Sequence, residues 1–236
     1  MGIVTMGIPQ EITIELARLN GSATFVETGT YTGGTTRWAS GHFESVHTIE
    51  RAETLYRKYG AALSQLGGVT PHLGDSRRIL PEILRALGDR TAVFWLDGHW
   101  SGGETAGAQD ECPLLDELAC LANRSGDIIL IDDARLFLCA PPAPHDPAQW
   151  PTLVEIVHAL PASGRSHFVQ VVDDVIFAVP GKDALKNCLV EYARRRSAQL
   201  LEELAQRRRS PESKAAPSLG GSLWRALRSI RRGSGD

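Results

Sequence analysis

Three aspartates in this sequence directly follow short apolar runs that are typical of buried strands. Asp97 ends one such run, and Asp132 and Asp133 end the next. If the two strands are parallel neighbours, their carboxyl ends meet at one edge of the sheet and bring three carboxylates together. Because three uncompensated anions repel, they favour a hard divalent cation, and an all-oxygen ligand set suits Mg²⁺ better than Zn²⁺. In the alternative interpretation, Asp133 caps the following loop or pairs with Arg135.

A histidine lies two residues beyond the first of these aspartates. An unperturbed imidazole titrates near neutral pH, so His99 can take a proton from a metal-polarised hydroxyl within hydrogen-bond reach. This position makes His99 the candidate base. His145, in the proline-rich segment 140–151, is a second candidate, and a purely structural role is the alternative for both.

Glycines interrupt the segment that follows the first predicted strand. The residues run Glu27-Thr-Gly29-Thr-Tyr31-Thr-Gly33-Gly34, and a helical pattern then begins. Gly29 and Gly33 carry no Cβ, so a ligand can approach the backbone, and the amides at the helix start face it. The spacing differs from the G-x-G-x-x-G of dinucleotide-binding proteins, because Tyr31 stands where a close pyrophosphate contact needs glycine. A tight turn without a ligand is the alternative.

Acidic and hydroxyl side chains end the second and third predicted strands. Glu50 falls about 20 residues beyond Gly29, where a carboxylate accepts two hydrogen bonds from a ribose diol. Together with the glycine turn, it indicates an adenosine-containing ligand, although it can instead cap the helix near Ala52. Asp75 and Ser76 are placed to contact an adenine edge, and Ser76 is also a suitable N-cap for the next helix.

Short β-rich runs alternate with helical patterns between these residues. We predict helices at 10–19, 35–41, 52–66, 76–87, 113–122, 152–160 and 185–206. We predict strands at 23–30, 45–50, 69–74, 91–97, 127–132, 167–172 and 175–179. Only two residues separate the last two strands, so they must pair as an antiparallel hairpin. The pattern predicts an α/β fold: a Rossmann-like, doubly wound, mostly parallel seven-stranded sheet with a C-terminal antiparallel hairpin.

Composition and charge divide the chain into three parts. The 236 residues carry a net charge of −3, but this total combines about −10 over residues 1–193 with +7 over 194–236. We expect an α/β domain with its N-terminal helix at 1–182, a helix at 183–209, and a basic linker with a short amphipathic helix at 210–236. An acidic body argues against a nucleic-acid partner. Four scattered cysteines and no signal-peptide pattern favour a reduced, cytoplasmic protein.

The basic tail has three interpretations. Leu223, Leu227 and Ile230 fall on one helical face with arginines opposite, the pattern of a helix that lies on an anionic membrane surface. The tail then gives the protein peripheral membrane contact. The alternatives are a solubilising tail and a docking site for a protein partner. Homo-oligomer formation is left open.

At this point the residues resemble those of a known enzyme family. The turn ETGTYTGGTT is similar to the E-L-G-x-Y-x-G-x-S turn of catechol O-methyltransferase and its metal-dependent relatives. LDGHW at 96–100 resembles the LDHW of their fourth strand with one glycine inserted, and IDDAR at 131–135 resembles the acidic pair of their fifth. The aspartates with a nearby histidine also resemble those of Mg²⁺-dependent macrolide-sugar O-methyltransferases. The resemblance covers residues 22–180 and is to class I S-adenosylmethionine (SAM)-dependent methyltransferases.

The resemblance implies a role for each singled-out residue. It places the SAM methionine end against Glu27, Gly29, Tyr31 and Gly33, the ribose against Glu50, the adenine near Asp75 and Ser76, and Mg²⁺ on Asp97, Asp132 and Asp133, with Asp97 also beside SAM. Catechol methyltransferases have a lysine base three residues after the first metal aspartate. Trp100 stands there in this sequence, so the base is assigned to His99.

The activity expected from these features is Mg²⁺-assisted, SAM-dependent methylation of a hydroxyl. The acceptor is expected to be a sugar, a glycan or another secondary metabolite with vicinal hydroxyls. A dinucleotide-dependent oxidoreductase is the first alternative, and the terminal hairpin, Tyr31 and the paired aspartates disfavour it. A non-catalytic SAM-binding module is the second.

Overall fold

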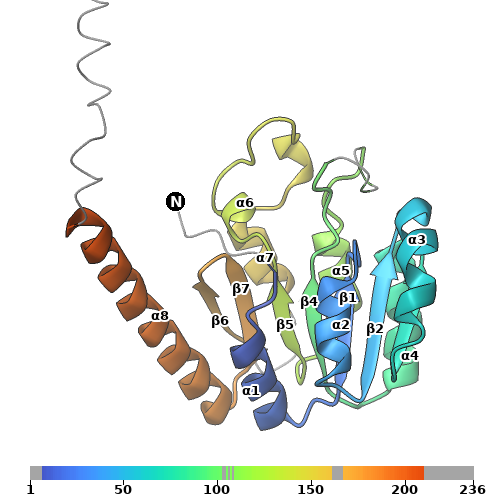
Figure 1. Cartoon of the computed structure of the whole chain (residues 1–236), viewed down its shortest axis with the longest axis horizontal. Coiled ribbons are helices and arrows are strands. Elements are labelled where there is room, and N and C mark those ends of the chain that lie inside the picture. The colour runs from blue at the N-terminus through green and yellow to red at the C-terminus, as the bar shows by residue number, and fades with distance from the viewer. Residues whose placement is uncertain (1–6, 103–104, 106, 108, 161–166, 210–236) are drawn as a thin grey trace, which may run out of the picture. The chain divides into compact units, whose positions relative to one another are not determined.

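A seven-stranded sheet forms the centre of the fold (Figure 1). The structure is a computed structural model, and it describes residues 7–102, 105, 107, 109–160 and 167–209. The strand order is β3-β2-β1-β4-β5-β7-β6. Neighbours are parallel except that β7 is antiparallel to both β5 and β6. The strands are β1 (Thr24–Thr28), β2 (Ser45–Glu50), β3 (Val69–Leu73), β4 (Ala92–Leu96), β5 (Ile128–Ile131), β6 (His167–Val172) and β7 (Val175–Pro180).

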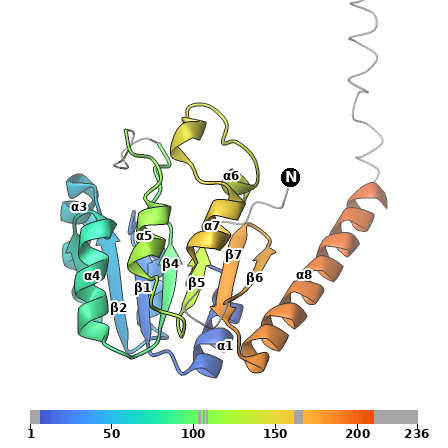
Figure 2. The same cartoon turned by 180° about the vertical axis from the view of Figure 1, so that it is seen from behind.

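Helices cover both faces of the sheet, because its central strands are apolar on both faces. Figure 1 shows α1 and α2 in front of the strands, and Figure 2, from behind, shows α5 and α7. The helices are α1 (Gln10–Asn20), α2 (Gly34–Ser40), α3 (Glu53–Leu63), α4 (Ser76–Leu87), α5 (Leu114–Cys120), α6 (Arg135–Leu138), α7 (Leu153–Ala159) and α8 (Asp183–Arg209), with a 3₁₀ turn η1 (Pro147–Gln149).

Alternate side chains of the strands enter two separate hydrophobic cores. Phe25 and Trp95 pack with Leu16 of α1 on one face. Val26 and Phe94 pack with the helices of the other face, including Leu80, Ile83, Leu118 and Ile156. The predicted doubly wound sheet with its C-terminal hairpin is therefore confirmed.

The chain divides into two units, Met1–Ala193 and Arg194–Asp236. The sheet lies in the first unit, and the described part of the second is the continuation of α8 to Arg209. The domain division expected from composition stays a prediction, and the tail at 210–236 lies outside the described residues. No helix within the described ranges is long and apolar enough to cross a membrane.

Two short elements were not predicted from the sequence. α6 has four residues and η1 has three, so neither is long enough to produce a periodic apolar pattern. α6 directly follows the acidic pair at the end of β5, and η1 lies in the proline-rich segment. Both segments lie next to the functional residues described below.

The register of the parallel strands sets their carboxyl ends side by side. Thr28 pairs with Leu96, and Leu96 pairs with Ile131, so the residues that follow these three strands meet at one edge. Gly29 has a φ of 83°, and a Cβ there would overlap the backbone carbonyl of Asp97. The close approach of β1 and β4 at this edge therefore requires glycine.

We predict that Gly29→Ala lowers the free energy of unfolding by about 1–3 kcal/mol, because the added methyl meets backbone in a left-handed conformation. Gly34→Ala is the matched control, since a Cβ at Gly34 meets nothing within 4 Å. It should leave stability unchanged or raise it by up to about 1 kcal/mol. Urea denaturation measures both, and equal stability of the two variants would contradict the close approach.

Candidate functional site

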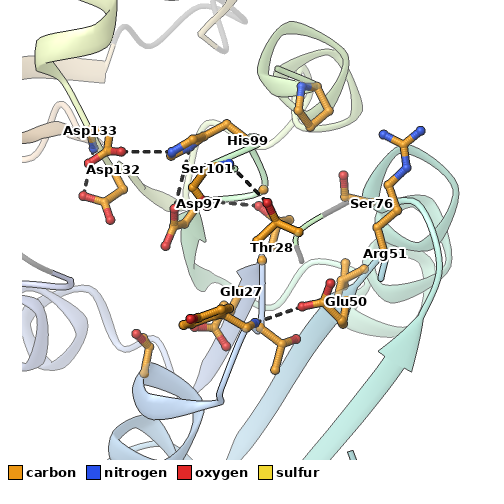
Figure 3. Close-up of a pocket in the computed structure, with 18 of the residues that line it drawn as sticks. Glu27, Thr28, Glu50, Arg51, Ser76, Asp97, His99, Ser101, Asp132 and Asp133 are labelled. Atoms are coloured by element: carbon orange, nitrogen blue, oxygen red, sulfur yellow. Dashed lines mark hydrogen bonds and ion pairs between the residues drawn. The ribbon is translucent and has the colours of Figure 1, made fainter. Parts of the chain in front are cut away.

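A cavity of about 510 Å³ opens at the carboxyl ends of the parallel strands. Figure 3 shows its side chains converging from β1, β2 and the segments after β4 and β5. Most of the sequence-predicted residues line it, namely Glu27, Gly29, Tyr31, Glu50, Asp75, Ser76, Asp97, His99, Asp132 and Asp133. Gly33 is not among the lining residues; it precedes α2 with a φ of 76°. The structure thus brings together residues that lie up to 106 positions apart in the chain.

Glu27 forms the buried floor of the cavity. Its side chain is 2% exposed and accepts hydrogen bonds from Thr36 Oγ1 at 2.5 Å and Thr48 Oγ1 at 2.7 Å. Burial raises the pKa of Glu27 from 4.5 to about 7, and the threonine hydrogen bonds only partly offset it. The carboxyl therefore keeps its proton to a higher pH than a glutamate in water does.

Glu50 fixes the glycine turn to the end of β2. Its Oε2 accepts a hydrogen bond from the backbone N of Tyr31 at 2.9 Å, and its Oε1 accepts one from the backbone N of Ala52 at 2.8 Å. Tyr31 has a φ of 49°. The contact to Ala52 matches the capping alternative, yet each carboxylate oxygen has a second lone pair for a ligand.

Asp75, rather than Ser76, is the N-cap of α4. Its Oδ1 accepts a hydrogen bond from the backbone N of Arg77 at 3.0 Å, and its Oδ2 lies 2.6 Å from Nη2 of the same arginine. The side-chain hydrogen bond to Arg77 lowers the pKa of Asp75. The capping role expected for Ser76 is wrong, because Asp75 takes the cap position, while the predicted adenine contacts of both residues remain predictions.

Asp97 and Asp132 lie together with raised pKa values. Burial is the main cause for both, and the charges of neighbouring aspartates add to it. The pKa of Asp97 lies well above its usual range and that of Asp132 is about 7. Asp132 Oδ1 accepts a hydrogen bond from the backbone N of Asp133 at 2.8 Å. These two carboxyls thus carry an electrostatic cost that a cation would remove.

Asp133 instead has two basic partners. Its Oδ2 lies 2.9 Å from His99 Nε2, and its Oδ1 accepts a hydrogen bond from Arg135 Nη1 at 2.6 Å. Burial would raise the pKa of Asp133, but His99 and Arg135 outweigh it and lower the value. Arg135 also pairs with Asp174. The pairing with Arg135 that the sequence offered as an alternative is therefore present.

Within the part of the chain that the structure describes, no three histidine, cysteine or acidic side chains are arranged to hold a metal ion. Both oxygens of Asp133 contact basic side chains, so a cation at this position would share them with His99 and Arg135. The three-aspartate metal site stays a prediction.

His99 lies between two aspartates. Its Nδ1 is 3.7 Å from Asp97 Oδ1 while Nε2 contacts Asp133, and its side chain is buried. Burial lowers the pKa of His99, but the Asp133 hydrogen bond and the charge of Asp97 outweigh it and raise the value. His145 is not among the residues lining the cavity, and its Nδ1 lies 3.0 Å from Glu111 Oε2.

Several residues around the site were not singled out from the sequence. Trp150 Nε1 donates a hydrogen bond to Glu111 Oε2. Glu117 is buried, and burial raises its pKa to about 7. None of the three sits at a strand end or in a recognisable motif. These residues stand out because their polar groups are buried, and the spacing of residue types in a sequence does not reveal burial.

Solved structures that are similar in fold to this chain include O-methyltransferases. The O-methyltransferase TomG from Streptomyces achromogenes, in complex with SAM, is 17% identical with a TM-score of 0.50, over 75% of this chain and 82% of that one. A caffeoyl-CoA O-methyltransferase candidate from Staphylococcus aureus is 12% identical with a TM-score of 0.52, over 76% and 86%. No family model and no curated protein sequence matches this chain. The chain thus has the fold of class I SAM-dependent methyltransferases, as the resemblance predicted.

The raised pKa of Glu27 predicts a specific pH dependence of stability. Between pH 4.5 and 7 the unfolded chain loses this proton while the folded chain keeps it. The free energy of unfolding of the wild type should therefore fall relative to Glu27→Gln by up to about 3 kcal/mol as pH rises through this window.

Urea denaturation of both proteins at several pH values measures the difference. Other titrating groups cancel in the comparison, and the difference should level off above pH 7. Parallel curves from pH 4.5 to 8 would show that the Glu27 carboxyl ionises in the folded protein as it does in water.

Proposed function

We propose that this protein is a SAM-dependent O-methyltransferase that methylates a hydroxyl of a sugar, glycan or secondary metabolite with the help of Mg²⁺. The observation that carries the proposal is Glu50, a carboxylate fixed to the glycine turn at the end of β2 and lining the cavity. A ribose diol needs an acceptor at this place in such a sheet. Tyr31, 58% exposed in the turn where dinucleotide-binding proteins need glycine, disfavours the oxidoreductase alternative.

The residues that line the cavity suit SAM in their chemistry. Gly29 lines the cavity in the turn after β1, Glu50 offers lone pairs for the ribose, and Ser76 lines the cavity at the start of α4. When bound, SAM supplies an electrophilic methyl group. The residues of this chain would orient it and exclude water from the reacting atoms.

The donor set at the acidic edge suits Mg²⁺. Asp97 and Asp132 offer carboxylate oxygens, burial and neighbouring aspartates raise the pKa values of both, and Mg²⁺ is commonly held by one or two carboxylates with water and substrate. Asp133 would be the third ligand through the lone pairs that its contacts with His99 and Arg135 leave. When bound, the ion would supply charge that favours the ionised form of the acceptor hydroxyl.

His99 is the proposed proton acceptor. Because Asp133 contacts Nε2, it holds the proton there, and Nδ1, 3.7 Å from Asp97 Oδ1, is the nitrogen that would take the hydroxyl proton. The same contact stabilises the imidazolium that results. This division of roles resembles the way a carboxylate orients the histidine of a hydrolase triad.

The expectations about partners and location also stay proposals. They are the absence of a nucleic-acid partner, homo-oligomer formation, a cytoplasmic location, and peripheral membrane contact through the basic tail. The tail lies outside the described residues.

We predict that Glu50→Gln weakens SAM binding about tenfold or more, because the amide has one acceptor oxygen where the carboxylate has two. Glu53→Gln is the matched control, since Glu53 is exposed and pairs only with Arg57 among the described residues. Calorimetric titration with SAM and with NAD measures both. Tight NAD binding, or SAM binding unaffected by Glu50→Gln, would contradict the proposal.

A second prediction concerns the metal. Methyl transfer to a panel of hydroxyl compounds should fall at least about tenfold with chelator, and Asp132→Asn should cause a similar fall, because it removes a ligand. Asp116→Asn, a matched change on the exposed side of α5, should have no effect. Activity indifferent to chelator and to Asp132→Asn would end the metal proposal while leaving methyl transfer intact.

A further inference from the structure

Glu111 is a buried carboxylate that the proposed reaction does not use. Its side chain is 3% exposed, and its Oε2 accepts a hydrogen bond from Trp150 Nε1 at 2.7 Å and lies 3.0 Å from His145 Nδ1. Its Oε1 accepts one from the backbone N of Asp146 at 3.1 Å. Burial alone would raise the pKa of Glu111, but these hydrogen bonds outweigh it and lower the value. Three donors thus converge on one charged group.

The backbone of Glu111 joins two segments that are far apart in the sequence. Its carbonyl accepts a hydrogen bond from the backbone N of Trp100 at 2.7 Å, and its amide donates one to Gln149 Oε1 at 3.0 Å. The segment that leaves β4 is therefore tied to the segment that contains η1. The two meet beside His99.

Trp150 contacts both Glu111 and the candidate base His99. Its ring centroid lies 5.3 Å from that of His99, with an angle of 58° between the planes, and 5.6 Å from that of Phe137. Trp150 is 7% exposed, so the ring is enclosed. Because Glu111 holds its only polar atom, the direction in which the indole faces His99 depends on that carboxylate.

We propose that Glu111 is a positioning residue: it orients Trp150, and Trp150 holds the His99 imidazole in the orientation that keeps Nε2 on Asp133 and Nδ1 on the side of Asp97. The inference rests on the proposed role of His99. The three donors now contact two carboxylate oxygens, whereas a glutamine side chain has only one acceptor oxygen. Glu111→Gln therefore leaves at least one donor without a partner. The indole, and with it the imidazole, would then shift.

The first test uses no enzymatic activity. The ring protons of His99, assigned with His99→Gln, should show a ring-current shift from Trp150 in the NMR spectrum of the wild type. Glu111→Gln should change that shift. Asp127→Asn is the matched control, because Asp127 is also a buried carboxylate with a backbone and an arginine partner, but it lies before β5, at the opposite end of the strand from Asp132. It should leave the His99 signals in place.

The second test separates positioning from cofactor binding. Glu111→Gln should lower kcat about tenfold or more while the Kd for SAM stays within about twofold. Trp150→Phe keeps a ring but loses the Nε1 donor. In that background Glu111→Gln should lower kcat far less than in the wild type, because the two residues act as one unit.

Three outcomes would overturn the inference. They are His99 signals that do not move in folded Glu111→Gln, an equal loss of kcat in Asp127→Asn, and additive effects of the Glu111 and Trp150 changes. If the wild type transfers no methyl group, the proposed function fails separately. The NMR shifts then still decide whether Glu111 sets the orientation of His99.

Discussion

Buried negative charge at one edge of the sheet is the constraint on which the rest of the site depends. Parallel pairing of β1, β4 and β5 leaves no alternative place for the residues that follow them, so Asp97, Asp132 and Asp133 must crowd together. The three carboxylates line one cavity, where like charges repel. Raised pKa values at two of the aspartates and basic partners at the third are the two ways in which the folded chain reduces this charge.

The surrounding elements provide those basic partners and hold them. Arg135 begins α6 and pairs with both Asp133 and Asp174. Because Asp174 belongs to the turn between β6 and β7, the hairpin helps to hold the arginine that contacts Asp133. His99 is enclosed between aspartates and an indole that Glu111 orients. The acidic edge of the cavity thus depends on residues of the short helix α6 and of the segments that follow β4 and precede α7.

The sheet and the strand-end residues were predictable because both follow from local patterns. Apolar runs predict the strands, and the polar residue that ends or follows each parallel strand lies at the carboxyl edge of the sheet. Glu50 and Asp97 line the cavity for this reason. The contact of Asp133 with His99 and the burial of Glu111 were not predictable in this way. They depend on how the segments after β4 and β5 fold against each other, through contacts between residues more than thirty positions apart.

The central claim is that the cavity is a SAM site organised by the acidic ends of β2 and β4. A crystal structure of the chain grown with S-adenosylhomocysteine tests it most directly. The account predicts the ligand in this cavity, with its ribose hydroxyls within hydrogen-bond distance of Glu50 and its amino-acid end beside Gly29. A ligand bound elsewhere, or a ribose that does not contact Glu50, would contradict it.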